Sequence, residues 1–257
     1  MSTFKLVLEY DGTGYSGWQR QPNAPTVQAA VEDVLTGIAE TTITVVAAGR
    51  TDAGVHALGQ VISFQTDRRL TARDWLRAAN ARLPEDISVI SSEAVPDDFH
   101  ARYSATGKLY RYRVLNRSEP SPLLRHRAWN IYKPLNEEAM RQAAAQLVGR
   151  HDFSAFECMP TENDNPICAL HSVELQRDGD LLDLSFYADR FLKQMVRSMV
   201  GTLVEIGQGK RQATDMQTIV KGCNRSAAGR TAPPQGLYLV RVDYEFGNRR
   251  RVADQAD

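Results

Sequence analysis

The chain has 257 residues, enough to bury a sizeable core in one large domain or in two ordinary ones. Its 31 basic and 31 acidic residues cancel, so the net charge by itself neither predicts nor excludes a polyanionic partner. Three cysteines without a C-x-x-C pair argue against a disulfide framework and a zinc ribbon, so we expect no metal site. The amino-terminal apolar run is too short for a signal peptide, and no later segment is apolar enough to span a bilayer. We therefore expect a soluble, cytoplasmic protein.

The first half of the chain predicts the order β-α-β-β-α-β. Thr26 is expected to cap the first helix, and Thr71 with Asp74 forms a capping box that opens the second. The predicted elements are a strand at 4–8, a helix from 27, strands at 42–48 and 60–66 around the loop GRTDAGVHALG (49–59), a helix at 71–83 and a strand at 87–95.

The second half predicts nearly the same order, with one extra strand and one extra helix. Asn136 is expected to cap its first helix, and Asp178-Gly179 predicts a hairpin between two strands. The predicted elements are strands at 108–116 and 127–132, a helix that Gly149 ends, strands at 168–176 and 181–189, helices at 191–207 and 214–224, and a closing strand at 236–246.

Two such halves favour an α+β fold built from two ferredoxin-like (split β-α-β) units, residues 1–105 and 106–246. Their strands would join into one extended, mainly antiparallel sheet with helices on one face. Residues 247–257 have little apolar content and are predicted to form a disordered tail.

The charge is unevenly distributed along the chain. Residues 101–133 hold eight basic residues and one acidic residue, and residues 134–189 hold eleven acidic and three basic ones. Aromatic residues alternate with the cations of the basic segment. This pattern is typical of a nucleic-acid surface, and equally of the solvated face of a strand.

The stretch LEYDGTGYSGWQ (8–19) contains G-x-G-x-x-G after a strand, which raises the possibility of a dinucleotide-binding enzyme. Such a turn must run directly into a helix that receives the pyrophosphate. Pro22 and Pro25 keep the chain out of a helix until Thr26, so the dinucleotide hypothesis is disfavoured. The glycines are instead expected to permit sharp turns and close approach of a ligand.

The loop GRTDAGVHA places Arg50, Asp52 and His56 between two strands, where reactive side chains are often held. A single loop aspartate more often caps a turn. Taken alone, Asp52 would be assigned that structural role, and His56 has no clear use.

Successive blocks of the sequence resemble the bacterial tRNA pseudouridine synthase A family, in order from residue 8 to about 246. The blocks are YDGTGYSGWQRQ, TVQAAVEDVL, GRTDAGVHALGQVISF, FHARYSATGKLYRYRV, HDFSAF, RFLKQMVRSMVGTLVEIG and GLYLVRVDYEF. The resemblance implies an isomerase that converts uridine to pseudouridine at positions 38, 39 and 40 of the tRNA anticodon stem-loop. It further implies a homodimer, a central cleft between two ferredoxin-like halves, and neither a cofactor nor a metal.

The same resemblance implies a role for each of five residues. Asp52 matches the catalytic aspartate, and Arg197 matches the basic residue paired with it. Arg50 matches the arginine that enters the RNA stem as the target nucleotide leaves. Tyr110 matches the tyrosine that stacks on the uracil, and Leu237 matches an apolar contact to the base.

The residues themselves are compatible with this chemistry. Breaking a glycosidic bond builds positive charge on the sugar, which an ionised carboxylate stabilises or captures. Arg197, among apolar neighbours, is a candidate to keep Asp52 charged. Asp52 would attack uracil at C6, attack the sugar at C1′, or promote a glycal intermediate. A non-catalytic RNA-binding protein on the same scaffold is the alternative, because the basic segment would serve it equally well.

Overall fold

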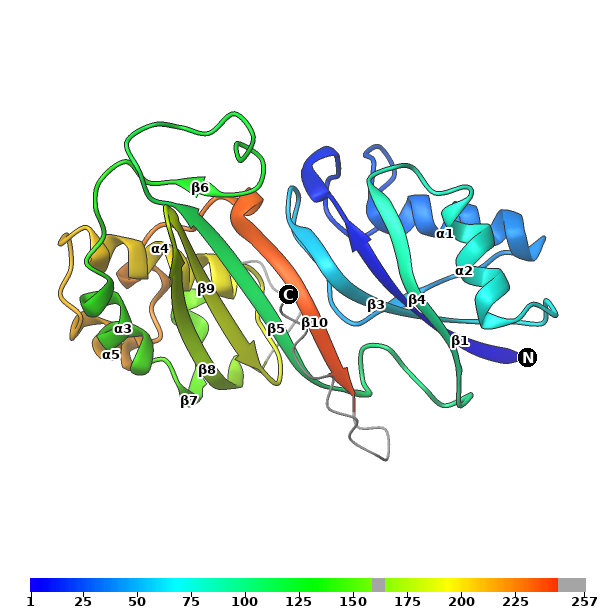
Figure 1. Cartoon of the computed structure of the whole chain (residues 1–257). Helices are drawn as coiled ribbons and strands as arrows, with labels where there is room; N and C mark the ends of the chain where they lie inside the picture. The colour runs from blue at the N-terminus through cyan, green and yellow to red at the C-terminus, as the bar shows by residue number, and fades with distance from the viewer. Residues whose placement is uncertain (159–164, 245–257) are drawn as a thin grey trace.

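The structure, a computed structural model, describes residues 1–158 and 165–244. This part of the chain forms an α+β fold in which five α-helices pack on one open, mixed and mainly antiparallel sheet of ten strands (Figure 1). The predicted tail at 247–257 lies outside the described residues.

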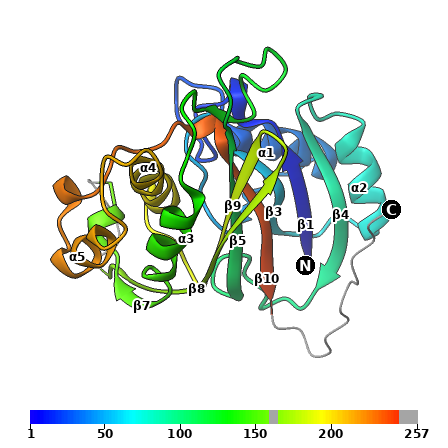
Figure 2. The ribbon, with the colours of Figure 1, turned by 60° about the vertical axis from the view of Figure 1, so that its left-hand side comes forward.

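One continuous sheet runs through both halves of the molecule (Figure 2). Eight strands follow one another in the order β4-β1-β3-β10-β5-β9-β8-β7, while β2 pairs with β3 and β6 pairs with β5. The strands are β1 Ser2–Tyr10, β2 Val46–Ala47, β3 His56–Thr66, β4 Ile87–Val95, β5 Ala105–Leu115, β6 Trp129–Asn130, β7 Gly149–Asp152, β8 Ile167–Asp178, β9 Leu181–Ala188 and β10 Leu237–Tyr244.

Three of the five α-helices in the described residues begin at the caps that the sequence predicts. Thr26 accepts a hydrogen bond from the Ala29 backbone, Thr71 and Asp74 form the expected capping box, and Asn136 caps the third helix. The α-helices are α1 Val27–Ala39, α2 Ala72–Asn80, α3 Glu137–Ala145, α4 Met195–Gly207 and α5 Asp215–Gly222. Local side-chain-to-backbone hydrogen bonds therefore fix most helix starts.

One face of the sheet is buried and the other is partly exposed, as strand alternation requires. Buried side chains alternate along β1 and along β9; they are Phe4, Leu6, Leu8 and Tyr10, and Leu182, Leu184, Phe186 and Ala188. The helices cover this apolar face. On it, Trp75 of α2 packs its ring against Phe4 and Phe64 of neighbouring strands.

The two halves join through a short parallel pairing between β3 and β10. Tyr238 lies opposite His56, and Leu239 lies opposite Ala57. The expectation of one extended sheet is thus confirmed. The junction directly follows the loop 49–55, so it positions that loop at the border between the halves.

Several predicted boundaries were wrong. The strand predicted at 42–48 shrinks to β2, because side chains of α1 take its backbone donors: Thr36 binds Ile43 N, and Glu32 binds Val45 N. The strand predicted at 127–132 is only β6, and the strand predicted from residue 60 begins at His56.

Two further boundaries differ beside the candidate site and in the second half. The helix predicted from residue 191 begins at Met195, because Gln194 adopts a left-handed conformation with φ of 60°. Gly149 does not end the helix, as predicted: α3 ends at Ala145, and Gly149 is the first residue of the four-residue strand β7, which was not predicted. So short a segment carries too few residues to display a period.

Candidate active site

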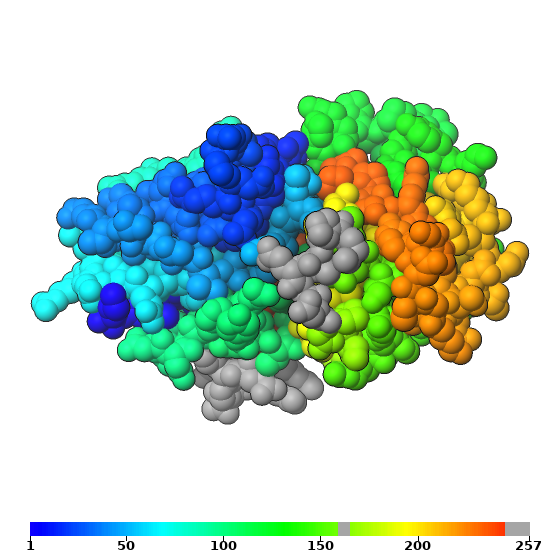
Figure 3. All heavy atoms as spheres, turned by 180° about the vertical axis from the view of Figure 1, so that it is seen from behind, coloured from blue at the N-terminus to red at the C-terminus, as the bar shows by residue number. Residues whose placement is uncertain are grey.

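A cavity of about 1000 Å³ opens where the two halves meet, on the sheet face that the helices cover. Figure 3 shows this side of the molecule, with the N-terminal half in blue and cyan beside yellow and orange segments of the C-terminal half. All five residues singled out in the sequence line the cavity: Arg50, Asp52, Tyr110, Arg197 and Leu237. The fold therefore gathers them from four separate segments.

Asp52 and Arg197 form an ion pair across the junction. Arg197 Nη1 lies 2.7 Å from Asp52 Oδ2, and the Arg197 side chain is 12% exposed while that of Asp52 is 29% exposed. The guanidinium is held from behind, since its Nε donates to the Ala232 carbonyl at 2.8 Å. Within the described residues Asp52 Oδ1 accepts no hydrogen bond, so one carboxylate oxygen is left for a ligand.

Backbone and side-chain hydrogen bonds hold the loop that carries Asp52. Trp18 N donates to the Thr51 carbonyl at 3.0 Å, and the side chain of Gln60 donates to the Gly49 carbonyl at 2.7 Å. The Thr51 hydroxyl lies 2.8 Å from the buried Tyr10 hydroxyl. These contacts fix the loop from β1, from β3 and from the stretch 8–19.

Two of the three glycines in residues 8–19 are needed for close packing inside the protein. A Cβ at Gly12 would lie 2.0 Å from the Val55 carbonyl oxygen, and one at Gly17 would lie 2.7 Å from that of Thr51. Gly17 also has φ of 95°, which L side chains rarely adopt. Gly14 has open space around it. Gly12 and Gly17 thus permit close approach of the loop 49–55 rather than of a ligand. The stretch does not lead directly into a helix, because α1 begins only at Val27.

Tyr110 lies on β5 with its ring packed edge-on against Phe191, 5.0 Å between centroids. Burial raises the pKa of Tyr110 well above its usual value, and nearby Tyr10 and Asp52 raise it further. The phenol is therefore neutral. Leu237 is 6% exposed and lines the same cavity, whereas Arg50 is exposed at its edge.

Lys108 also lines the cavity, and the sequence analysis did not single it out. It lies two residues before Tyr110 on β5, so both side chains share the same sheet face. This alternation was the signal that would have identified it. His100, Arg102 and Tyr103 contribute to the same wall.

The arginines of the basic segment are largely neutralised within the protein. On the opposite sheet face, Arg113 makes two hydrogen bonds to Asp183, at 3.0 and 2.9 Å. Arg117 pairs with Asp180 at 3.2 Å. For Arg113 of β5 the interpretation as a strand face turned away from the cavity holds, and Arg117 lies in the loop that follows β5, while Arg102 and Lys108 of the same segment line the cavity.

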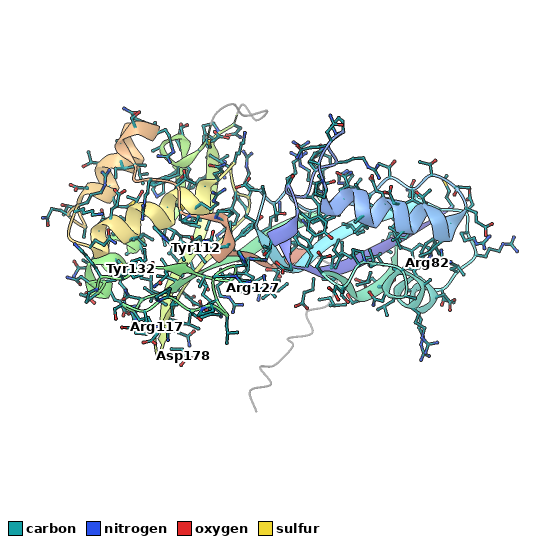
Figure 4. All side chains as sticks on the ribbon, turned by 90° about the horizontal axis from the view of Figure 1, so that it is seen from above. Arg82, Tyr112, Arg117, Arg127, Tyr132 and Asp178 are labelled. Carbon is teal, nitrogen blue, oxygen red and sulfur yellow. The ribbon has the colours of Figure 1, made fainter. Side chains whose placement is uncertain are left out.

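Arg127 closes the opposite side of the junction. Its guanidinium binds both carboxylate oxygens of Asp11, at 2.7 and 2.6 Å, and its carbonyl accepts from the Tyr238 hydroxyl. Figure 4 shows Arg127 at the border between the halves. His56 stacks on Tyr238 with 4.8 Å between centroids and is 2% exposed. His56 is therefore a buried strand residue at the end of the loop 49–55.

Residues 1–158 and 165–244 hold neither a candidate metal site nor a candidate membrane-spanning helix. No cluster of three or more His, Cys, Asp or Glu side chains is arranged to bind a metal ion. None of the helices in these ranges combines the length and the apolar character that crossing a membrane demands.

Comparisons with known proteins point to one family. The sequence profile described as tRNA pseudouridine synthase matches residues 6–104 and 143–245. The chain is 44% identical to tRNA pseudouridine synthase A of Acetivibrio thermocellus, over 95% of the chain and 100% of that relative. It is 44% identical to the protein of that name from Myxococcus xanthus, over 98% and 96%, and 45% identical to that of Rhodopseudomonas palustris, over 95% and 100%.

Proposed function

Since the chain belongs to the tRNA pseudouridine synthase family and is an isomerase of tRNA uridine, we propose that Asp52 is its nucleophile. We further propose that its targets are uridines 38, 39 and 40 of the anticodon stem-loop. The observation that carries the first proposal is the Asp52–Arg197 pair at the cavity wall, with Oδ1 of Asp52 directed to no protein partner in the described residues.

The reaction exchanges one glycosidic bond for another within a single molecule. The N1–C1′ bond breaks and the C5–C1′ bond forms, while the C5 proton leaves and N1 gains a proton. Electrons balance without a redox partner, so we propose that the reaction proceeds without a cofactor. Asp52 either bonds to the substrate transiently, at C6 or C1′, or promotes a glycal intermediate.

Arg197 holds the Asp52 carboxylate in place through the ion pair. Its guanidinium donates to Oδ2 and is itself fixed by the Ala232 carbonyl, so the carboxylate is held in one orientation. A positioned carboxylate needs no reorganisation when positive charge develops on the sugar. Arg197 is thus a positioning residue for Asp52.

The other three residues are proposed to handle the nucleotide. Tyr110, neutral and rigidly packed against Phe191, would receive the uracil ring, and Leu237 would contact the base beside it. Arg50, exposed at the edge of the cavity, would occupy the stem when the target nucleotide flips out. Extruding a base in this way is required wherever chemistry occurs on a stacked nucleotide.

The strand orders support a finer description of the fold. In the N-terminal half the strands lie in the order β4-β1-β3-β2, and in the C-terminal half in the order β10-β5-β9-β8. In each of these sets of four, the last strand along the chain lies beside the first, and the third and then the second follow. We propose that residues 1–105 and 106–246 are two ferredoxin-like halves with the active cleft between them. We also propose that the protein is a homodimer and that it is located in the cytoplasm.

The test is tritium release from an anticodon stem-loop transcript labelled at C5 of uridine. The wild-type chain should release tritium at positions 38–40, and Asp52→Asn should bind the RNA but lose turnover by about 10⁴-fold or more. Asp180→Asn, at an exposed ion pair far along the chain from the site, is the matched control and should turn over normally. An Asp52→Asn variant that keeps its rate would overturn the role of Asp52.

The other hypotheses fare less well. Family membership identifies an enzyme, which disfavours the alternative hypothesis of a purely RNA-binding protein. The dinucleotide hypothesis lacks the helix that must follow its glycine turn, as α1 begins well beyond Gly17.

A further inference from the structure

The cavity offers more room than a single flipped nucleotide needs. Its volume of about 1000 Å³ equals the upper end of the range for small-molecule sites, roughly 300–1,000 Å³. Asp52, Tyr110 and Leu237 account for one part of its lining. The segment 100–108 forms another part, to which the proposed reaction assigns no role.

An exposed tyrosine in that segment forms a flat, preorganised surface. The Tyr103 ring is 76% exposed and stacks on the His100 imidazole, with 4.3 Å between centroids and 28° between planes. Two backbone N–H groups, of Arg102 and Tyr103, donate to His100 Nδ1 at 3.2 Å each. Ser104 closes the turn through hydrogen bonds with the His100 backbone. The imidazole is therefore fixed, and the tyrosine ring rests on a rigid support.

Two cationic side chains, Arg102 and Lys108, lie beside this aromatic surface. The Arg102 guanidinium lies 5.6 Å from the centre of the Tyr103 ring. Lys108, half-buried in the wall, forms no ion pair or hydrogen bond in the part of the chain that the structure describes. Burial, with the nearby charges of Arg102 and Arg190, lowers the pKa of Lys108 to about 8 against the opposite effect of Asp189. An ammonium in such a place is stabilised by an anion.

We propose that residues 100–108 form a subsite for a nucleotide that flanks the target uridine. Tyr103, supported by His100, stacks on the base of that nucleotide, and Lys108 with Arg102 binds its phosphodiester. Aromatic rings beside cations are the usual combination for single-stranded nucleic acid, because every base has a π-face and every nucleotide a charge. The inference rests on the proposed function, since the target uridine defines which nucleotide is the neighbour.

The charge of the cavity lining supports this assignment. Among its described lining residues are five Lys or Arg side chains and two acidic ones, Asp52 and Glu157. Arg197 is already paired with Asp52. Of the other four cations, Arg102 and Lys108 belong to the segment 100–108, where they lie beside Tyr103 and would contact the phosphate of the flanking nucleotide.

Two variants test the two halves of the subsite on the same anticodon stem-loop RNA. Tyr103→Ala should weaken binding by about 5- to 150-fold, the range measured for one base stacked on an aromatic ring, and Tyr103→Phe should bind like the wild type. Lys108→Met should reduce the slope of log Kd against log salt concentration by about 0.7, and Lys108→Arg should restore it. The matched controls are Tyr132→Ala and Lys221→Met, which alter exposed residues outside the cavity lining (Figure 4 labels Tyr132).

An abasic nucleotide identifies the ligand of Tyr103. Placed at the neighbouring position that stacks, it should abolish the difference between wild type and Tyr103→Ala, since the base is then missing in both complexes. The inference is overturned if abasic substitution on either side of the target leaves that difference intact. It is also overturned if Lys108→Met keeps the wild-type salt slope, or if Tyr132→Ala weakens binding as much as Tyr103→Ala. Wild-type tritium release, measured in parallel, separates these outcomes from a failure of the proposed function.

Discussion

Replacing Gly12 by alanine should damage catalysis from a position that touches no substrate. The added Cβ would lie 2.0 Å from the Val55 carbonyl oxygen, whereas real Cβ contacts stay above 3.0 Å, so backbone must move by about 1 Å. Val55 N donates to the Asp52 carbonyl at 3.1 Å, which carries the displacement directly to Asp52, the proposed nucleophile. A misplacement of about 1 Å at a reacting group costs about 10²-fold in rate.

The same clash should lower stability as well. Overpacking of this kind costs about 1–3 kcal/mol, and each kcal/mol lowers Tm by roughly 2–4 °C in a chain of this size. Gly14→Ala, in the same 3₁₀ turn but with nothing within 4 Å of its Cβ, is the matched control.

The assay is the initial rate of tritium release at saturating RNA, with thermal unfolding of each variant. We expect Gly12→Ala to lose about 10²-fold in kcat and several degrees in Tm, while Gly14→Ala matches the wild type. If Gly12→Ala turned over normally, or if Gly14→Ala were equally slow, the glycine would not be needed for approach of the loop.

Three further predictions concern charged side chains. Arg197→Met should reduce kcat by at least about 10²-fold at unchanged RNA affinity, because Asp52 loses its positioning partner, and Arg197→Lys should recover part of the rate in the same assay. Burial alone would raise the pKa of Asp11, but hydrogen bonds from Arg127 and Thr13 outweigh it and hold that pKa well below its usual range. The stability that this ion pair contributes is present above about pH 4 and is lost as the pH falls. In urea unfolding, Arg127→Ala should therefore be less stable than the wild type at pH 6, and the difference between the two should be smaller at pH 3. The pKa of Lys108, lowered by burial to about 8, means that the folded protein releases this proton before the unfolded chain does, so stability rises between pH 8 and 10. Lys108→Met should therefore be more stable than the wild type at pH 7, and parallel urea titrations should find the gap smaller at pH 9.5.

Local patterns in the sequence determined the helix caps, the hairpin and most strands. Thr26, the Thr71–Asp74 box and Asn136 act within three or four residues of one another, so their hydrogen bonds can be predicted from spacing. The exclusion of a dinucleotide turn after Gly17 depended on the same kind of local information. The block GRTDAGVHA indicated Asp52 and its role in the family. Lys108 belongs to no such block, and only the alternation of side chains along its strand could have indicated that it shares a sheet face with Tyr110.

Contacts between distant segments were decided only by the tertiary structure. Asp52 and Arg197 meet because β3 and β10 pair and bring α4 against the loop, a long-range arrangement that no periodicity encodes. Long-range contacts also shortened β2, since α1 side chains satisfy its backbone donors. The purpose of Gly12 and Gly17 became visible for the same reason: the atoms that a side chain would strike belong to a loop some forty residues away. Sequence spacing specifies local hydrogen bonds, and the packing of the two halves specifies the site.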